Sequence, residues 1–316
     1  MSDLLRVEEL TVNYDSSNGR VYALRGVSFN VKRGEIVGII GETGSGKTTI
    51  CHAVMGLIGK KADISGKILF KGRNVSTLAE EDLRKLYSRE IALLPQSIAS
   101  LNPFIKIGTH IKETLKACSN IKGARSLKKK ALDLLTTFQF SDSKLAYRSF
   151  PFQLSGGMNQ RALMAITFCC SPSLVIADEP TKSLDLGLKD TFLETMDRLK
   201  GDRNISMLIV THDLEVVEKV CDRIAVIYDG LFVETGKAGD VMSMPLHPYT
   251  RSLIQALPKN GMCPTWGFAP SSLENNDGCS FQPRCPVGKR LEKKHVVPSS
   301  VMVGKDHLVW CCDVKG

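Results

Sequence analysis

The sequence predicts an α/β fold with a mainly parallel sheet, a helical insert, and a small irregular extension that contains cysteines. Short segments rich in Ile and Val alternate with helical patterns before about residue 97 and after about residue 170, which is typical of a parallel sheet covered by helices. Between about residues 98 and 165 the patterns are helical and strand signals are few. From about Pro245 onward, Pro, Gly, Asn and Ser accumulate. We therefore expect a main domain over residues 1–258 and an extension over residues 259–316.

The expected strands are short apolar or alternating segments in which β-branched residues are frequent. They cover residues 4–14, 27–31, 35–40, 91–94, 173–177 and 206–210. The expected helices have apolar residues at helical spacing and cover residues 48–57, 107–116 and 127–138. The last two of these helices lie in the middle stretch and predict the helical insert.

The bulk composition favours a cytosolic globular chain. The hydrophobic fraction is 43%, no run reaches the roughly 18 apolar residues of a membrane-spanning helix, and the first ten residues lack the apolar core of a secretory signal. The net charge is +9, with small basic clusters at residues 128–130 and 289–294. Because the other positive residues are scattered, we interpret the charge as a solvated surface, with a patch facing anionic lipid as the alternative.

The ten cysteines fall into two groups. Six are scattered through the first 263 residues in mostly apolar or helical contexts: Cys51, Cys118, Cys169, Cys170, Cys221 and Cys263. We expect these six to be small hydrophobic side chains that a cytosolic protein keeps reduced. The other four, Cys279, Cys285, Cys311 and Cys312, are bunched near the end of the chain.

A glycine-rich segment after the expected strand at residues 35–40 has the composition of a phosphate-binding loop. It reads Gly41, Glu42, Thr43, Gly44, Ser45, Gly46, Lys47, Thr48, followed by Thr49. Glycines let backbone N–H groups curl around phosphates, and the helix that follows offers its N-terminus to an anion. Lys47 can then contact the terminal phosphates, and the hydroxyl of Thr48 can bind Mg²⁺. The alternative is a chance glycine-rich turn.

Two carboxylates follow the expected strand at residues 173–177. Asp178 and Glu179 would lie at the carboxyl edge of the sheet, where ligands bind in open α/β folds. Asp178 can hold Mg²⁺, and Glu179 can act as general base toward an attacking water. The alternative is a surface acidic pair that begins a turn before Pro180.

A second anion cradle lies before the same strand, at Leu154, Ser155, Gly156, Gly157 and Met158. A serine and two glycines at the start of a helix again suit a phosphate. This segment resembles the signature motif of ABC ATPases. In that family the motif binds the ATP held by the opposite subunit, so the resemblance implies that two subunits enclose two ATP molecules.

The other motifs of the family follow in order, and the resemblance covers about residues 4–258. Tyr14 resembles the aromatic that stacks on adenine, with Tyr22 as a weaker candidate, and Gln96 resembles the loop glutamine that reaches Mg²⁺ and lies where the permease docks. Asp185, in Ser183-Leu184-Asp185, resembles the residue that communicates across the dimer, and His212 resembles the histidine that contacts the γ-phosphate. The resemblance therefore implies a P-loop NTPase with a RecA-like core that binds ATP and Mg²⁺. Mg²⁺ would be held through Thr48, Gln96 and Asp178, and catalysis would involve Glu179, His212 and Gln96.

Three further segments resemble the peptide/nickel importers within this family. They are residues 100–103 (SLNP), 247–251 (HPYTR) and 278–286 (GCSFQPRCP). The resemblance implies a peripheral subunit at the cytoplasmic face of the membrane. Its expected partners are a second, non-identical ABC ATPase subunit, two permease subunits and an extracytoplasmic solute-binding protein, with no nucleic acid. We expect peptides as cargo. The alternatives are nickel or another metal chelate, an exporter subunit, and a soluble ABC ATPase that acts on DNA or ribosomes.

The cysteines of the extension depart from the pattern of relatives that hold a [4Fe–4S] cluster. Cys279, Cys285 and Cys311 match, but residues 286–297 contain no further cysteine, and four thiolates are the usual requirement. Cys312 or His295 would have to serve as fourth ligand. We expect an extension without metal, with a [4Fe–4S] cluster and then a structural zinc as the alternatives. Lys182, just before Ser183, is a second departure and adds a charge beside the loop that faces the dimer.

Overall fold

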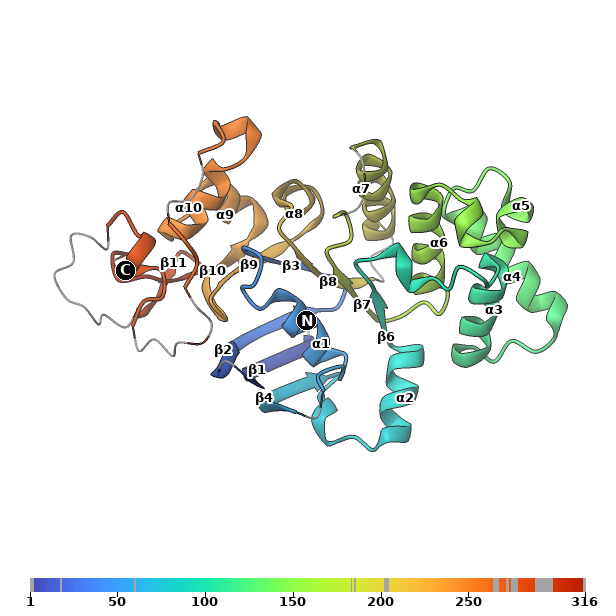
Figure 1. Ribbon diagram of the computed structural model, residues 1–316, viewed down its shortest axis with the longest axis horizontal. Helices are drawn as coiled ribbons and strands as arrows, with labels where there is room; N and C mark the ends of the chain where they lie inside the picture. The colour runs from blue at the N-terminus through green and yellow to red at the C-terminus, as the bar shows by residue number, and fades with distance from the viewer. Residues whose placement is uncertain are drawn as a thin grey trace. The chain divides into compact units, whose positions relative to one another are not determined.

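The computed structural model describes residues 3–17, 19–59, 61–182, 184, 186–201, 205–263, 267–270, 273, 278–287 and 298–314. The chain divides into two compact units, Met1–Ser76 with Ile209–Gly316, and Thr77–Leu208. Figure 1 labels most of the helices and strands. The two units divide near residues 76 and 208, not at the domain boundary that the sequence predicts at residue 258. That boundary therefore stays a prediction. Among the described residues, no helix combines the length and hydropathy that a membrane crossing needs.

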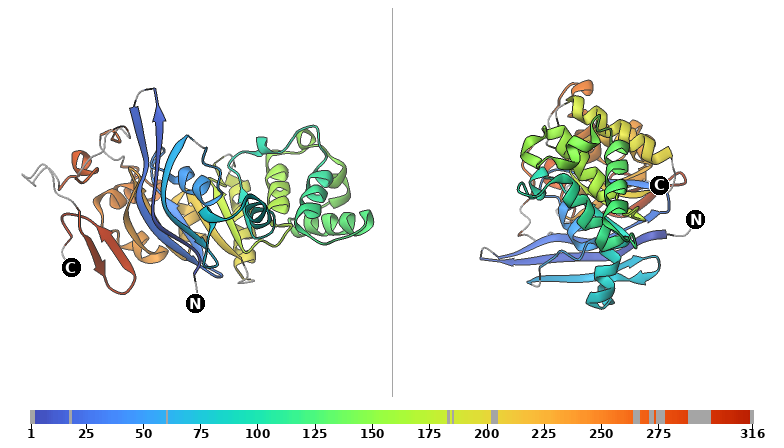
Figure 2. Two further views of the ribbon diagram at one scale, coloured as in Figure 1. Left: turned by 90° about the horizontal axis from the view of Figure 1, so that it is seen from below. Right: turned by 90° about the vertical axis from the view of Figure 1, so that its right-hand side faces the viewer.

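The first unit contains two sheets. An antiparallel sheet has the order β2-β1-β4-β5, with β1 (Asp3–Ser16), β2 (Gly19–Lys32), β4 (Ala62–Phe70) and β5 (Arg73–Asn74). In Figure 2 β1 and β2 form a long twisted hairpin. The other sheet has the order β11-β12-β10-β9-β3-β8, with β3 (Ile36–Ile40), β8 (Ser206–Thr211), β9 (Arg223–Tyr228), β10 (Leu231–Lys237), β11 (Ser300–Val303) and β12 (His307–Trp310). β3 and β9 are parallel, and β9, β10, β12 and β11 follow one another in antiparallel pairs.

The described helices of the first unit are α1 (Lys47–Val54), α8 (Leu214–Val220), α9 (Ala238–Ser243), α10 (Pro248–Gln255) and the short 3₁₀ helices η4 (Pro258–Asn260) and η5 (Gln282–Arg284). Two of these helices, α8 and α10, begin with a side-chain cap. Asp213 caps α8 by accepting from the N–H groups of Glu215 and Val216. All five residues of β3 are buried, which explains why that segment is a continuous apolar run.

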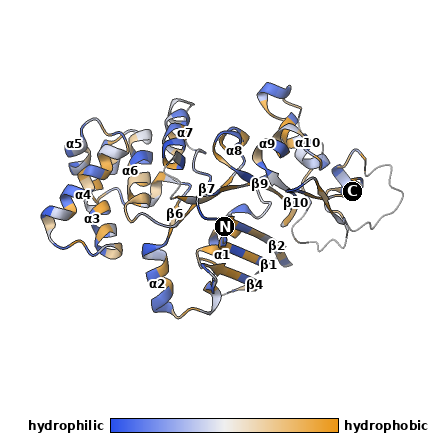
Figure 3. Ribbon diagram, turned by 180° about the vertical axis from the view of Figure 1, so that it is seen from behind, coloured by the Kyte–Doolittle hydropathy of each residue, from blue (hydrophilic) through white to orange (hydrophobic). Residues whose placement is uncertain are grey.

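The second unit is mostly helical. It contains α2 (Glu80–Arg89), β6 (Ile91–Leu94), η2 (Ile98–Ser100), α3 (Ile107–Cys118), α4 (Ala124–Thr137), α5 (Ser143–Arg148), η3 (Pro151–Gln153), α6 (Gly156–Phe168), β7 (Leu174–Asp178) and α7 (Leu186–Gly201). β6 and β7 are parallel, and residues up to Leu208 of β8 also belong here. Between Ile98 and Phe168, all of which the structure describes, there is no strand. Figure 3 shows apolar and polar residues together on α3 and α4, as expected for amphipathic helices.

The sequence-based elements are confirmed, with differences at their ends. The expected strand at residues 27–31 is the second half of the longer β2, and the expected helices at 107–116 and 127–138 are α3 and α4. The extension is less irregular than its composition predicts, because β11 and β12 form a hairpin and Glu234 of β10 pairs with Val309 of β12. Four-residue strands carry too little alternation to stand out in a sequence.

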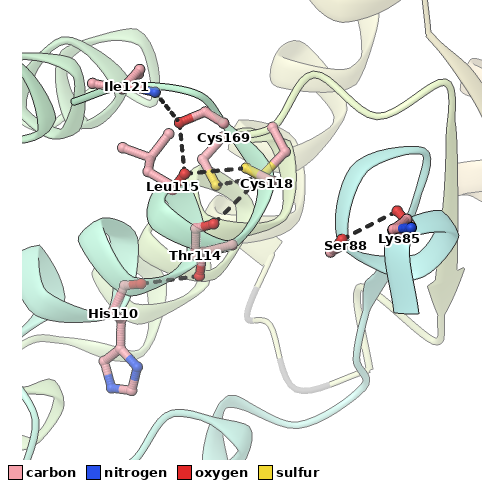
Figure 4. The surroundings of a disulfide bond; sticks show 10 residues. Lys85, Ser88, His110, Thr114, Leu115, Cys118, Ile121 and Cys169 are labelled. Carbon is pink, nitrogen blue, oxygen red and sulfur yellow. Dashed lines mark hydrogen bonds between the residues drawn. A yellow bond between two sulfur atoms is a disulfide. The ribbon is translucent and has the colours of Figure 1, made fainter. Parts of the chain in front are cut away.

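The expectation that all six scattered cysteines are reduced thiols is wrong in the structure. Cys118 at the end of α3 and Cys170 just after α6 form a disulfide, with their Cα atoms 5.9 Å apart (Figure 4). The two residues are 52 positions apart in the sequence, so no local pattern relates them. Cys51, Cys169, Cys221 and Cys263 are not in disulfides, which agrees with the expectation for these four.

Candidate functional site

The loop between β3 and α1 packs closely against the backbone of β9 and β2. A Cβ at Gly41 would lie 2.3 Å from the carbonyl oxygen of Ile227, and one at Gly46 would lie 2.6 Å from that of Ala23. Gly46 also has a φ of 105° and directly precedes α1, so only glycine suits both positions. The sequence therefore folds this segment into a tight turn that presents the start of α1, as a phosphate-binding loop requires.

Two polar side chains of the loop, those of Lys47 and Ser45, are buried, whereas Thr43 is exposed. The buried ammonium of Lys47 donates to the carbonyl oxygens of Gly41 and Glu42, at 2.7 and 2.8 Å. The buried hydroxyl of Ser45 has no hydrogen-bond partner among the described residues, and a phosphate oxygen is a group that could satisfy it. Thr48 is exposed at the start of α1. The loop thus fits an anionic ligand.

An arginine of the extension holds the loop, and sequence reasoning did not single it out. The guanidinium of Arg284 in η5 forms two parallel hydrogen bonds with the carboxylate of Glu42, at 2.9 and 3.0 Å. Its side chain is 5% exposed, donates to the hydroxyl of Tyr228 and lies over the rings of Tyr228 and Phe281. Two-pronged charge-assisted pairs of this kind fix orientation as well as adding energy. The available signal was its position one residue before Cys285.

A tyrosine of the HPYTR segment holds the same loop by its backbone. The fully buried Tyr249 accepts a hydrogen bond at its hydroxyl from the N–H of Glu42, at 2.8 Å. His247 caps α10, because its Nδ1 accepts from the N–H of Tyr249 at 3.1 Å. Glu234 in turn accepts from the N–H of His247 and contacts Nε2 of His307 at 2.6 Å. The segment that suggested an importer therefore supports the phosphate loop physically.

A cavity of about 150 Å³ lies beside the loop within the first unit. It is lined by residues 42–45, by Tyr228 at the end of β9 and the following Asp229, and by Ala269 and Pro270 of the extension. Burial raises the pKa of Asp229, against the opposing effects of Ser280 and Arg25. The extension thus reaches the edge of the candidate phosphate site.

Two other predicted site residues belong to the first unit. Tyr14 lies in β1, opposite Val21 of β2 and Ala62 of β4. His212 is exposed and follows directly after β8, between Thr211 and the cap residue Asp213. Each of these positions is compatible with its predicted role.

The acidic pair ends β7 in the second unit. Asp178 is the last residue of that strand, and Asp178 and Glu179 are 7% and 8% exposed. Glu179 has a φ of 47°, a conformation that is strained for a residue with a side chain and tends to occur at functional sites. Behind the pair, the side chain of Gln160 donates to the carbonyl oxygen of Pro180 at 3.0 Å. Burial and strain make an ordinary surface acidic turn a poor description of this pair.

The second anion cradle lies at the start of α6 in the same unit. Ser155 caps α6 by accepting from the N–H of Met158 at 3.3 Å. Ser155 and Gly156 are exposed, while the buried Asn159 donates to the carbonyl oxygens of Pro151 and Leu154 and fixes the preceding turn. The helix start is thus rigid and open to a ligand from outside the chain. Gln160 links this helix to the acidic pair.

The remaining predicted residues are placed as follows. Gln96 is half-buried two residues after β6, and Ser97 beside it caps η2. Lys182 is exposed. Ser183, Asp185 and the alternative ligand His295 lie outside the described residues. The structure thus groups the phosphate loop, Tyr14 and His212 in one unit, and Gln96, the acidic pair and the signature segment in the other.

The four cysteines of the extension line one small cavity together with His247 and Phe281. Burial raises the pKa of the thiols of Cys279 and Cys311, and it raises that of Cys312 to about 11. Four thiols on one cavity are a donor set that fits an iron–sulfur cluster. A single tetrahedral zinc ion, with Zn–S bonds of about 2.3 Å, needs sulfurs about 3.8 Å apart. No three of these four sulfurs, all of which the structure describes, lie within 4.8 Å of one another. Among the described residues, Cys118, Cys169 and Cys170 are the only cysteines that meet this criterion.

Comparison with known families agrees with this geometry. Residues 24–182 match the family model described as "ABC transporter", and residues 233–290 match "Oligopeptide/dipeptide transporter, C-terminal region". The oligopeptide transport ATP-binding protein OppD of Escherichia coli is 35% identical over 289 residues, covering 90% of this chain and 86% of that protein. The dipeptide transport ATP-binding protein DppD of Bacillus subtilis is 33% identical over 321 residues, covering 98% and 95%.

Solved structures give the same result for the fold. The chain is similar to the dimeric structure of a bacterial ABC transporter cassette, with a TM-score of 0.67 and 25% identity over 74% of this chain and 98% of that chain. A dimeric post-hydrolysis state of an ATP-binding cassette, bound to ADP and phosphate, matches with a TM-score of 0.66 at 25% identity, over the same 74% and 98%.

The ion pair between Arg284 and Glu42 leads to a prediction about nucleotide affinity. Arg284→Met removes the charge but keeps an unbranched side chain against the two rings. Because the loop loses a charge-assisted clamp, we expect ATP to bind about 5 to 30 times more weakly, which corresponds to about 1–2 kcal/mol. Isothermal titration with ATP measures the change.

The matched control is Arg223→Met. Arg223 begins β9, pairs with Glu35 and Asn30, and lies at the opposite end of that strand from Tyr228. It should leave ATP affinity unchanged. Equal affinity in wild type and Arg284→Met would show that the clamp does not support the loop.

The neutral, buried His247 leads to a prediction about pH. Burial, assisted by Arg251, lowers its pKa to about 4, against about 6.5 in the unfolded chain. Between these values the unfolded state binds the extra proton, so stability rises with pH from about 4 to 6.5. Between pH 7 and pH 5 this group should cost the fold about 2 kcal/mol.

The comparison variant is His247→Asn, which keeps a capping acceptor but does not titrate. Urea unfolding of both proteins at pH 5 and pH 7 gives the four free energies. The wild type should lose about 2 kcal/mol more than the variant on acidification. Equal losses would mean that His247 is not the group responsible.

Proposed function

The chain belongs to the ABC transporter family, in the branch that carries the oligopeptide/dipeptide transporter C-terminal region, and from this premise we propose that it hydrolyses ATP to energise the import of peptides across a membrane. The observation that carries the peptide assignment is the match of residues 233–290 to that C-terminal region. The relatives named above, which transport oligopeptides and dipeptides, support it. They favour peptide over the nickel alternative.

ATP binding falls to the first unit. The N–H groups at the start of α1 receive the phosphates, and the hydroxyl of Ser45 gains an acceptor. The ammonium of Lys47 exchanges the carbonyl oxygens of Gly41 and Glu42 for the terminal phosphates, since a fixed cation there offsets the charge that develops in phosphoryl transfer. Tyr14 stacks on adenine, and His212 contacts the γ-phosphate.

Hydrolysis requires residues of the second unit. Glu179 accepts the proton of the attacking water as general base, and Gln96 orients that water. Mg²⁺, when bound, neutralises charge on the phosphates, and the oxygen donors of Thr48, Gln96 and Asp178 suit its preference. Because phosphoryl transfer depends mainly on positioning and electrostatics, the rigid setting of Glu179 contributes directly to the rate.

Turnover requires a second ATP-binding subunit. The cradle at Ser155 and Gly156 is exposed and receives the γ-phosphate of the ATP that the other subunit holds. Asp185 communicates across the same interface. Family membership implies membrane permeases as partners. We propose two of them, docking near Gln96 at the cytoplasmic face, with an extracytoplasmic solute-binding protein and a non-identical second ATPase subunit.

The four cysteines of the extension supply the number of thiols that a [4Fe–4S] cluster needs, so we propose the cluster, which is the alternative to the metal-free extension expected from the sequence. Cys279, Cys285, Cys311 and Cys312 would hold it, with Cys312 in place of the cysteine missing after Cys285. A bound cluster would cross-link the two ends of the extension and so stabilise the segment that carries Arg284. No step of ATP hydrolysis depends on it.

The role of Glu179 can be tested in the assembled transporter. Glu179→Gln removes the base but keeps the size of the side chain, so ATP binding should persist while hydrolysis falls by about 10²–10⁴-fold. Glu113→Gln, on the exposed face of α3, is the control and should hydrolyse normally. Normal turnover by Glu179→Gln would exclude Glu179 as the base.

The substrate can be tested by uptake in cells whose only copy carries Lys47→Ala, which removes the phosphate-binding ammonium. We expect uptake of labelled di- and oligopeptides to be lost and uptake of labelled nickel to continue. Loss of nickel uptake with intact peptide uptake would make the chain a metal importer subunit instead.

A further inference from the structure

The helical part of the second unit contains a cluster of three cysteines that has no part in ATP hydrolysis. Cys118 ends α3, while Cys169 and Cys170 follow α6 directly. Their three sulfur atoms all lie within 4.8 Å of one another. Cys118 and Cys170 form the disulfide, and the sulfur of Cys169 lies 3.4 Å from that of Cys170 (Figure 4).

The third thiol distinguishes this cluster from an ordinary structural disulfide. A disulfide needs two sulfurs, and Cys169 supplies a third at close range. Cys169 is buried, whereas Cys118 and Cys170 are half-buried, so the cluster has one closed side and one side that solvent can reach. Several cysteine sulfurs close together are the donors that soft cations prefer once they are deprotonated.

We propose that, once the disulfide is reduced, Cys118, Cys169 and Cys170 bind one thiophilic d¹⁰ cation of the Zn²⁺ type. Tetrahedral coordination with Zn–S bonds of about 2.3 Å places the sulfurs about 3.8 Å apart. The 3.4 Å between Cys169 and Cys170 is already close to that value. Cleavage of the disulfide lets Cys118 move away from Cys170 to a similar distance, so only small shifts at two helix ends are required.

Burial raises the pKa of the Cys169 thiol to about 12, and the nearby Lys130 opposes that shift, so a bound cation must displace the proton of this thiol. Three thiolates and a divalent cation carry a net charge of −1, and the ammonium of Lys130 lies near enough to Cys169 to interact with it electrostatically. Lys130 belongs to the basic cluster at residues 128–130. The sulfur of Cys118 contacts the carbonyl oxygen of Leu115, and that of Cys170 the carbonyl oxygen of Thr114. The solvent side leaves the fourth coordination position for water.

The chemistry has two steps. An external dithiol reduces the disulfide by thiol–disulfide exchange: the bond between Cys118 and Cys170 breaks, both become thiols, and the dithiol becomes a disulfide. The cation then displaces one proton from each of the three thiols and forms three metal–sulfur bonds. The metal thus replaces the covalent link between the ends of α3 and α6.

Cd²⁺ titration of the full-length protein tests the proposal, because Cd²⁺ prefers thiolates and its bonds to sulfur absorb in the ultraviolet. The protein is compared with its disulfide intact and after treatment with dithiothreitol that is then removed. The reduced form should bind one equivalent more than the disulfide form, with a matching rise in absorption. Reoxidation should abolish that equivalent, and this readout requires no variant.

Variants separate this site from the cysteines of the extension. Cys118→Ser, at a half-buried helix end, should bind Cd²⁺ at this site at least about tenfold more weakly, and Cys169→Ser should do the same. Cys263→Ser, an exposed free thiol, should match the wild type. The proposal is overturned if reduction adds no equivalent, or if Cys118→Ser binds as many equivalents as tightly as the wild type.

Discussion

The first unit depends on holding a short stretch of backbone, residues 41–48, in one conformation. A loop that offers N–H groups to an anion has few of them left to pair within the loop, where the N–H of Ser45 donates to the carbonyl oxygen of Glu42. Other parts of the unit therefore have to keep the loop rigid. Gly41 and Gly46 pack closely against neighbouring backbone. The hydroxyl of Tyr249 accepts from the amide of Glu42, and Arg284 pairs with the Glu42 carboxylate. The extension is therefore part of the phosphate site's support.

That support is itself anchored by buried polar groups. Glu234 is fully buried and accepts from the backbone at Leu246 and His247 while contacting His307 of β12. Buried acceptors of this kind are costly to leave unpaired, so the hairpin of the extension, α10 and the loop are energetically connected. In the second unit a single side chain holds the turn at the acidic pair. Gln160 of α6 donates to the carbonyl oxygen of Pro180, next to the strained Glu179.

Sequence reasoning predicted the local features and missed the distant contacts. The loop at residues 41–48, β7 with its two carboxylates, and the capped start of α6 each have a dense local pattern, because composition and order alone determine them. Arg284 looks like any surface arginine until the chain folds it against Glu42, 242 residues away. The roles of His247 and Tyr249 could not be predicted either. The HPYTR segment indicates a family resemblance, but it does not indicate that the Tyr249 hydroxyl contacts the phosphate loop.

The cysteines show most clearly where sequence spacing fails and geometry decides. The four in the extension attract attention because they are bunched, yet no three of their sulfurs, all in the described part of the chain, lie within 4.8 Å of one another, and the four line a cavity. Cys118 attracts none, because 52 residues separate it from Cys170, but the ends of α3 and α6 bring it next to two adjacent thiols. A tetrahedral ion needs close sulfurs and a cluster needs a cavity between them, so the two groups are suited to different chemistry.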